Sequence, residues 1–250
     1  MKNFNLKGKN IIITGASSGI GKEIAKLCVE NGANVGLLGR NEEALKDLVN
    51  SFTNGNNHFL ACDLGEIDFE VKFISFLNHF TKVDGFVHSA GAEITKSLSI
   101  TKALDFIDNF QLNVISGFMI SKIISNRKYL NATTSYVFIS SVMSIVGQPG
   151  KVVYSSSKGA LVSGARSMAL ELIPKNIRVN VISPGMVNTP MSNKMTSRLP
   201  AEAVEEIHKL HPLGIGSPLD VANAAYFLLT DASTWITGIN LIVDGGYTLK

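Results

Sequence analysis

NIIITGASSGIGK, residues 10–22, is the stretch of the sequence that decides the fold. Its run of isoleucines predicts a buried β-strand, and the helix-forming residues 22–30 predict the α-helix that follows. Between them, Gly15, Gly19 and Gly21 allow a sharp turn and close packing of the helix on the strand. The unpaired N–H groups at the start of this helix would bind an anion, and a pyrophosphate fits that position.

Two kinds of phosphate-binding loop have to be distinguished at this turn. If Gly21-Lys22 is aligned with the Gly-Lys of a nucleotide triphosphatase loop, Ala16 falls where the first glycine belongs. Glu23 then takes the place of the magnesium-binding Ser or Thr. A dinucleotide site fits better, although this stretch alone also permits a tight strand–helix connection that binds no ligand.

The composition limits the classes of protein to consider. The chain has 250 residues, of which 45% are hydrophobic and 17% charged, which suffices for a packed α/β core. A net charge of +3 without basic runs argues against nucleic-acid binding. We find no apolar stretch near the ~20 residues that span a bilayer and no signal core after Met1, which predicts a cytoplasmic protein.

The few cysteines and histidines do not suggest a metal. Cys28 and Cys62 have neither metal-ligand nor disulfide-framework spacing, and we expect both to be buried thiols. The five histidines are scattered along the chain, so no zinc site is predicted.

Apolar runs alternate with helix-forming segments along the whole chain. After the first strand, strands are predicted at Asn34–Leu38, His58–Ala61, Gly85–His88, Tyr136–Ser140, Ile177–Ile182 and Ile239–Val243. Beyond the first helix and one capped by Asn41, helices are predicted at about Glu66–Phe80, Lys102–Ser125, Val153–Ile173 and Pro218–Leu229. Near-continuous apolar strands are typical of a parallel sheet covered on both faces. We therefore expect residues 1–250 to form one Rossmann-type, doubly wound domain of about seven parallel strands.

The longest irregular stretch lies between Pro184 and Pro218. A loop of this length in a compact domain is usually a lid or a binding element. We expect residues 185–217 to cover the site as a mobile lid.

Tyr154 and Lys158 stand four residues apart at the start of a predicted helix, so both lie on one face. A nearby ammonium favours the phenolate, which would let the tyrosine exchange a proton with a carbonyl or alcohol near neutral pH. Such a pair also occurs on many helices that have no catalytic role. Ser141 follows a predicted strand, where ligands bind in an open α/β sheet; Ser140 and Ser144 are alternatives.

Taken together, these motifs resemble the short-chain dehydrogenase/reductase family over almost the whole chain. They occur in the family's order: Thr14-Gly15-x-x-x-Gly19-x-Gly21, Asp63 after the third strand, His88-Ser89-Ala90-Gly91, Asn113, Ser141, Tyr154-x-x-x-Lys158 and Pro184-Gly185-x-x-x-Thr189. The resemblance implies an NAD(P)-dependent oxidoreductase acting on CH–OH groups. The chain departs from the family at His88-Ser89, where the family has two asparagines that brace the sheet.

The resemblance also implies roles for single residues. Tyr154 would be the general acid/base, Ser141 would polarise the carbonyl, and Lys158 would bind the nicotinamide ribose and lower the pKa of Tyr154. Asn113 would hold a water in a proton relay, or be a buried amide that satisfies helix backbone. The residues expected to contact the cofactor are Gly15, Ser17, Ser18, Gly19, Ile20, Gly21, Arg40, Asp63, Leu64, Ala90, Gly91, Tyr154, Lys158, Pro184, Gly185, Val187 and Thr189.

The end of the second strand predicts which nicotinamide cofactor is used. An NAD site generally has a carboxylate there, whereas this chain has Gly39-Arg40. Arg40 can pair with the 2′-phosphate of NADP, and Gly39 leaves room for it, so NADP(H) is favoured over NAD(H). The alternative is a solvated loop arginine. Glu42 and Glu43 are better explained as charges in a first helical turn.

Candidate pocket residues are apolar and suit an aliphatic or flat substrate, although ordinary packing is an equal alternative; they are Met143, Val146, Met186, Met191 and Met195. The resemblance to 3-oxoacyl-[acyl-carrier-protein] reductases implies a 3-oxoacyl thioester, with Arg127, Lys128 and Lys175 placed to meet acidic acyl carrier protein. Steroids, sugars, polyols and small ketones are alternatives. A cofactor-binding scaffold without activity is a further alternative, which the intact Ser141, Tyr154 and Lys158 disfavour. The helices 102–125 and 153–173 and the tail 235–249 indicate subunit contacts, and the resemblance implies a homotetramer, although the sequence also permits a dimer.

Overall fold

The structure is a computed structural model that describes residues 4–66, 68–197 and 199–249. Ile67, in the predicted helix 66–80, and Arg198, in the predicted lid, lie outside the described residues.

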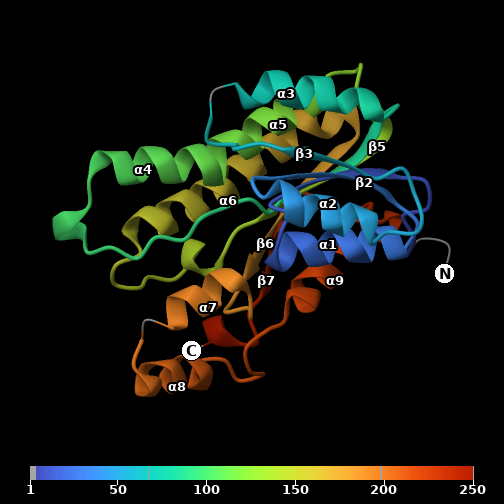
Figure 1. Ribbon diagram of the computed structural model, residues 1–250. Coiled ribbons are helices and arrows are strands. Elements are labelled where there is room, and N and C mark those ends of the chain that lie inside the picture. The colour runs from blue at the N-terminus through green and yellow to red at the C-terminus, as the bar shows by residue number, and fades with distance from the viewer. Residues whose placement is uncertain (1–3, 67, 198, 250) are drawn as a thin grey trace.

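One parallel sheet of seven strands forms the centre of the structure, in the order β3-β2-β1-β4-β5-β6-β7 (Figure 1). The strands are β1 (Asn10–Thr14), β2 (Asn34–Gly39), β3 (His58–Ala61), β4 (Val83–His88), β5 (Leu130–Ile139), β6 (Ile177–Pro184) and β7 (Asn240–Val243). All neighbouring strands pair in parallel. The order reverses between β1 and β4, which is the switch point where such sheets bind ligands. The predicted fold class is confirmed.

Helices cover both faces of the sheet. They are α1 (Gly19–Glu30), α2 (Glu42–Asn50), α3 (Phe69–Phe76), α4 (Ala103–Phe110), α5 (Ser116–Ile124), α6 (Val152–Leu172), α7 (Pro190–Thr196), α8 (Ala201–Lys209) and α9 (Pro218–Leu229). Two apolar cores lie between the helices and the sheet. One includes Phe73 of α3, Ile120 of α5 and Leu161 of α6. The other includes Ile24 of α1 and Val221 of α9.

Several local features that the sequence predicts are present in the structure. Asn41 caps α2, its side chain accepting a bond from the Ala44 N–H at 3.0 Å, and Glu42 and Glu43 lie in the first turn as predicted. Cys28 and Cys62 are buried thiols, which confirms the prediction for both. Within the described residues, no helix is long and apolar enough to cross a bilayer.

The predicted single helix Lys102–Ser125 is interrupted. A π-helical turn, Gln111–Ile115, separates α4 from α5. Such turns insert one extra residue and often occur at functional sites, and a hydrophobic periodicity of 3.6 does not reveal them. Strand β5 also starts earlier than the predicted Tyr136–Ser140, at Leu130. The sequence pattern did not show this, because residues 131–133 are exposed and do not form an apolar run.

The stretch between Pro184 and Pro218, predicted to be irregular, contains the helices α7 and α8. The prediction of irregular structure was therefore wrong. Thr189 caps α7, accepting from the Ser192 N–H at 3.2 Å, with Pro190 in the first turn. Helix α8 follows Pro200 directly, without a side-chain cap hydrogen bond. The two helices lie next to each other, away from the main helical layers and near the C-terminus (Figure 1). The predicted lid motion stays a prediction.

Candidate active site

A cavity of about 480 Å³ opens at the carboxyl ends of the central strands. Most residues predicted to bind the cofactor line it: Gly15, Ser17, Ser18, Gly19, Ile20, Arg40, Asp63, Leu64, Ala90, Gly91, Tyr154, Lys158, Pro184, Gly185, Val187 and Thr189. Ser141 lines it as well. Gly21 and Asn113 do not lie among the described lining residues.

The glycine-rich turn after β1 is shaped by backbone contacts. Gly15 has a φ of 68° and Gly19 a φ of 54°, a left-handed backbone that favours glycine. A Cβ on Gly21 would lie 2.4 Å from the carbonyl oxygen of Gly15, so Gly21 allows α1 to pack on the turn rather than lining the cavity. The Ser18 side chain makes no cap hydrogen bond and no acidic residue lies in the first turn of α1. These features fit a bound pyrophosphate.

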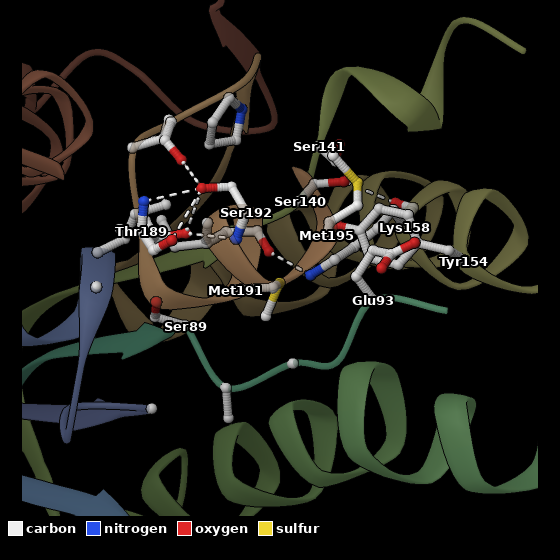
Figure 2. Close-up of a pocket in the computed structure, with 18 of the residues that line it drawn as sticks. Ser89, Glu93, Ser140, Ser141, Tyr154, Lys158, Thr189, Met191, Ser192 and Met195 are labelled. Atoms are coloured by element: carbon white, nitrogen blue, oxygen red, sulfur yellow. Dashed lines mark hydrogen bonds between the residues drawn. The ribbon is translucent and has the colours of Figure 1, made fainter. Parts of the chain in front are cut away.

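Three predicted catalytic side chains meet on one side of the cavity, where Figure 2 shows Ser141, Tyr154 and Lys158 close together. Ser141 lies two residues after the end of β5, and its Oγ accepts a bond from the Met143 N–H at 3.2 Å. The Lys158 ammonium donates to the carbonyl oxygen of Ile139 at 2.9 Å and lies 5.8 Å from the centre of the Tyr154 ring. The helical spacing and the strand end therefore bring all three together.

The pKa values of this group are set mainly by burial. Burial raises the pKa of Tyr154 to about 12; a hydrogen bond from Ser141 lowers it, and the Glu93 carboxylate raises it further. Burial lowers the pKa of Lys158 to about 8. Lys158 is not among the groups that shift the pKa of Tyr154 here, so the lowering that the resemblance implies stays a prediction. The ammonium lies over the ring and is held by a backbone carbonyl, and removal of the phenolate from water has the larger effect.

The Asn113 side chain is fully used within the protein. Its two Nδ2 protons are shared among three acceptors, which are Ala92 O at 3.1 Å, Asn109 Oδ1 at 3.0 Å and Ser157 Oγ at 3.0 Å. Its Oδ1 accepts from Ala92 N at 2.8 Å. The amide thus ties the π-helical turn to the loop after β4 and to α6. The amide is buried, as in the second alternative, but the backbone groups that it satisfies belong to the loop residue Ala92 and not to a helix; the relay role stays a prediction.

Arg40 stands where the second strand ends. Its side chain is 71% exposed and its Nη1 lies 3.9 Å from Asp63 Oδ2. Gly39 packs near Ser17: a Cβ on Gly39 would lie 3.3 Å from the Ser17 hydroxyl. A long, exposed guanidinium beside a glycine and a serine has the donors and the freedom to bind a phosphate at this rim.

Sequence reasoning missed a charged pair in the cavity wall. Lys151 donates to Glu93, and both residues line the cavity. Lys151 lies three residues before Tyr154 and Glu93 two residues after Gly91, so nearness to the catalytic motifs was the signal that the sequence offered; no spacing rule joins the two residues.

Comparison with known proteins places this geometry in a family. The family model described as enoyl-(acyl carrier protein) reductase matches residues 15–248. The chain belongs to the short-chain dehydrogenase/reductase family. It is 34% identical to an NAD-dependent glycerol dehydrogenase of Listeria innocua, over all of this chain and 97% of the relative. It is 32% identical to a 3-oxoacyl-[acyl-carrier-protein] reductase of Chlamydia pneumoniae, over 98% of this chain and 99% of the relative.

A solved structure agrees with this assignment. A short-chain type dehydrogenase/reductase from Mycobacterium ulcerans superposes with a TM-score of 0.91 at 28% identity, covering 98% of this chain and 92% of that one. The protein is therefore an oxidoreductase of a family that binds a nicotinamide cofactor.

The short-chain dehydrogenase/reductase motif is altered at His88, and the structure shows how. Thr14 Oγ1 lies 3.0 Å from His88 Nδ1, and His88 Nε2 lies 3.2 Å from the Asn113 carbonyl oxygen. Thr14 Oγ1 also accepts from the N–H groups of Ser89 and Ala90, so its own proton points to Nδ1. The ring is then neutral, with its proton on Nε2, and it braces the glycine-rich turn against the π-helical turn.

We expect the buried His88 to make the protein less stable at acidic pH. Burial lowers the pKa of His88 to about 3, so below pH 6.5 the unfolded chain binds a proton that the native chain does not. The free energy of unfolding should therefore fall as the pH drops from about 6.5, by about 2 to 3 kcal/mol at pH 4.5 at ~1.4 kcal/mol per unit. Urea unfolding of wild type and His88→Asn at pH 7 and 4.5 measures this. An equal loss in both proteins would contradict the assignment.

The basic residues predicted to dock acyl carrier protein lie at the end of the sheet opposite the cavity. Arg127 and Lys128 precede the N-terminal end of β5, and Lys175 precedes that of β6. None of them lines the cavity, which lies at the opposite, carboxyl ends of these parallel strands. Of the predicted apolar pocket residues, Met143, Met186, Met191 and Met195 line the cavity and Val146 does not.

Proposed function

We propose that this protein is an NADP(H)-dependent oxidoreductase that transfers a hydride between the nicotinamide and a carbonyl or secondary alcohol substrate. The convergence of Ser141, Tyr154 and Lys158 on one cavity wall carries the proposal. The cofactor supplies or accepts the hydride when bound. The test is NADPH consumption with a panel of ketones, hydroxyketones and 3-oxoacyl thioesters; a protein that binds NADPH and consumes it with none of them would be the cofactor-binding scaffold.

The protein's own residues would divide the remaining chemistry between them. Ser141 would donate a hydrogen bond to the substrate oxygen, and the Tyr154 hydroxyl would give that oxygen its proton during reduction and take it back during oxidation. Lys158 would bind the ribose hydroxyls and place its positive charge beside Tyr154. Asn113 would act indirectly, by holding the π-helical turn and the start of α6 in position.

Arg40 would select NADP(H) by pairing with the 2′-phosphate. We expect Arg40→Asp to raise the dissociation constant for NADPH at least about tenfold and to favour NADH, because a carboxylate repels a phosphate and accepts bonds from ribose hydroxyls. Nucleotide titrations of both proteins measure this, with Arg127→Asp, outside the cavity, as the matched control. An unchanged affinity for NADPH would refute the assignment. The NAD-dependent relative makes this test necessary.

Two substrate classes are candidates. A 3-oxoacyl thioester, the class predicted from the sequence, is supported by the similar 3-oxoacyl reductase and by the methionines of the cavity. A hydroxylated ketone or polyol is supported by the charged pair of Glu93 and Lys151 and by the similar glycerol dehydrogenase. Docking of acyl carrier protein, if it occurs, needs a surface other than the one predicted from Arg127, Lys128 and Lys175.

A homotetramer is proposed as the assembly. Large apolar side chains are exposed on α4 and α6, including Leu104, Ile107 and Leu170, and Trp235 before β7 is fully exposed. Such side chains are typical of subunit contacts. Light scattering should give a mass near four times the 26.9 kDa of one chain. A mass of twice that value indicates the dimer. The cytoplasmic location stays a prediction.

A further inference from the structure

An ion pair is built into the wall of the cavity beside the catalytic tyrosine. Lys151, directly before α6, is only 5% exposed. Its ammonium donates to Glu93 Oε1 and to Thr95 Oγ1 at 2.5 Å, and its Nζ lies 3.7 Å from Met195 Sδ. Figure 2 shows Glu93 on the same side of the cavity as Tyr154 and Met195. The wall is otherwise rich in methionine, so a charged pair here needs an explanation.

The loop that carries Glu93 is fixed to the start of α6. The Lys96 N–H donates to Gly150 O at 2.8 Å, and Lys96 forms an ion pair with Asp105 at 2.6 Å. Gly150 has a φ of 79°, and a Cβ there would lie 3.1 Å from Thr95 Cγ2. The backbone segments that carry Glu93 and Lys151 are therefore held against each other.

The pair has hydrogen-bonding capacity left over. Glu93 Oε1 accepts from Lys151 and from Thr95 Oγ1 at 2.5 Å. Within residues 4–66, 68–197 and 199–249, no hydrogen bond reaches the other carboxylate oxygen, Oε2. The remaining proton of Lys151 faces a thioether sulfur, which is a weak acceptor. The wall thus offers an occupant one strong acceptor, Oε2, and beside it a donor that would exchange its weak bond to the Met195 sulfur for a stronger one to the occupant.

A hydroxyl group matches this arrangement, because it donates one hydrogen bond and accepts another. A thioester carbonyl would accept from Lys151 but would leave Oε2 without a donor, and a methylene would satisfy neither group. A carboxylate oxygen removed from water without a donor is costly, so acyl chains would be penalised at this position.

We propose that Glu93 and Lys151 select substrates that carry a hydroxyl group beside the reacting carbon, such as α-hydroxyketones and the corresponding vicinal diols. The inference rests on the proposed hydride transfer. It chooses the hydroxylated class over the 3-oxoacyl thioester as the preferred substrate of this site.

The test compares two ketones of nearly the same shape. In 1-hydroxybutan-2-one a hydroxyl replaces one methyl group of pentan-3-one, and kcat/KM with NADPH is measured for both. We expect wild type to prefer the hydroxyketone at least about tenfold, since a site built to bind a hydroxyl rejects an analogue without it. Glu93→Gln keeps the side-chain shape but can present an amide donor in place of Oε2, and should lose most of the preference.

A double variant and a control complete the design. Glu93→Leu with Lys151→Met removes both charges together, so neither is left unpaired, and should lower kcat/KM for the hydroxyketone to the pentan-3-one value. Lys122→Met, at an exposed position of α5, loses the same charge and does not line the cavity, so its preference should match wild type. NADPH binding, followed by fluorescence, checks that each variant is folded.

The outcomes distinguish a failure of this inference from a failure of the proposed function. Equal kcat/KM for the two ketones in wild type overturns the inference, and so does a preference that survives in both Glu93→Gln and the folded double variant. Efficient reduction of a 3-oxoacyl thioester with neither ketone reduced also overturns it, while the proposed function stands. If wild type reduces no carbonyl compound, the proposed function fails and the inference fails with it.

Discussion

Tyr154→Phe is expected to lower kcat about 10³-fold, within the 10²–10⁴-fold that a positioned acid or base contributes. The dissociation constant for NADPH should stay within about twofold, because the phenylalanine ring keeps the packing and removes only the hydroxyl. Steady-state kinetics with the best substrate of the panel, together with NADPH titration, measures both quantities.

Tyr129→Phe is the matched control for this variant. Tyr129 directly precedes β5, at the edge of the sheet opposite the cavity, and is not among the residues that line it. Its loss of a hydroxyl should leave kcat unchanged. If Tyr154→Phe retains more than a third of the wild-type kcat while Tyr129→Phe behaves as wild type, the proton is transferred by another group and the mechanism is wrong.

Lys158→Met is expected to lower kcat about 10²-fold or more and also to raise the KM for NADPH, since it removes a charge beside Tyr154 and a donor to the ribose. The pH profile gives a second readout. Burial lowers the pKa of Lys158 to about 8, so above that pH the ammonium of the free enzyme loses its proton. Wild-type kcat/KM for reduction should fall there, and the variant should lack this limb.

Lys175→Met is the control, because the Lys175 ammonium also donates to a backbone carbonyl, that of Ser125 at 3.1 Å, but at the far edge of the sheet. It should keep the wild-type profile and KM. A Lys158→Met protein with normal KM for NADPH and an unchanged limb near pH 8 would exclude Lys158 from both roles.

Much of the fold follows from local sequence. The isoleucines of β1, the glycines of the first turn and the cap Asn41 each act on their own neighbours, so periodicity and cap chemistry reveal them. The π-helical turn could not be predicted, because one extra residue in a helix leaves no mark on the pattern around Asn113. The helices α7 and α8 were hidden by polar, proline-rich composition, although Thr189-Pro190 is a start signal.

In the site, too, some residues could be predicted from the sequence and others could not. Tyr154 and Lys158 are linked by helical spacing, and Ser141 by its place at a strand end, so sequence motifs could predict them. The partners of His88 and Lys151 lie on other elements, at Thr14 and Glu93, and only the folded chain shows which pairs meet. The pKa of Tyr154 depends on how much water its hydroxyl loses, which a spacing rule does not contain.

The central claim is that this cavity transfers a hydride between NADPH and a substrate carbon with Tyr154 as the proton donor. The most direct measurement uses NADPH deuterated on the transferred position of the nicotinamide, a carbonyl substrate from the panel, and mass spectrometry of the alcohol. The account predicts one deuterium on the carbinol carbon in wild type, and about 10³-fold slower formation of that product in Tyr154→Phe. Product without deuterium, from either deuterated epimer of the cofactor, or equal rates in the two proteins, would contradict it.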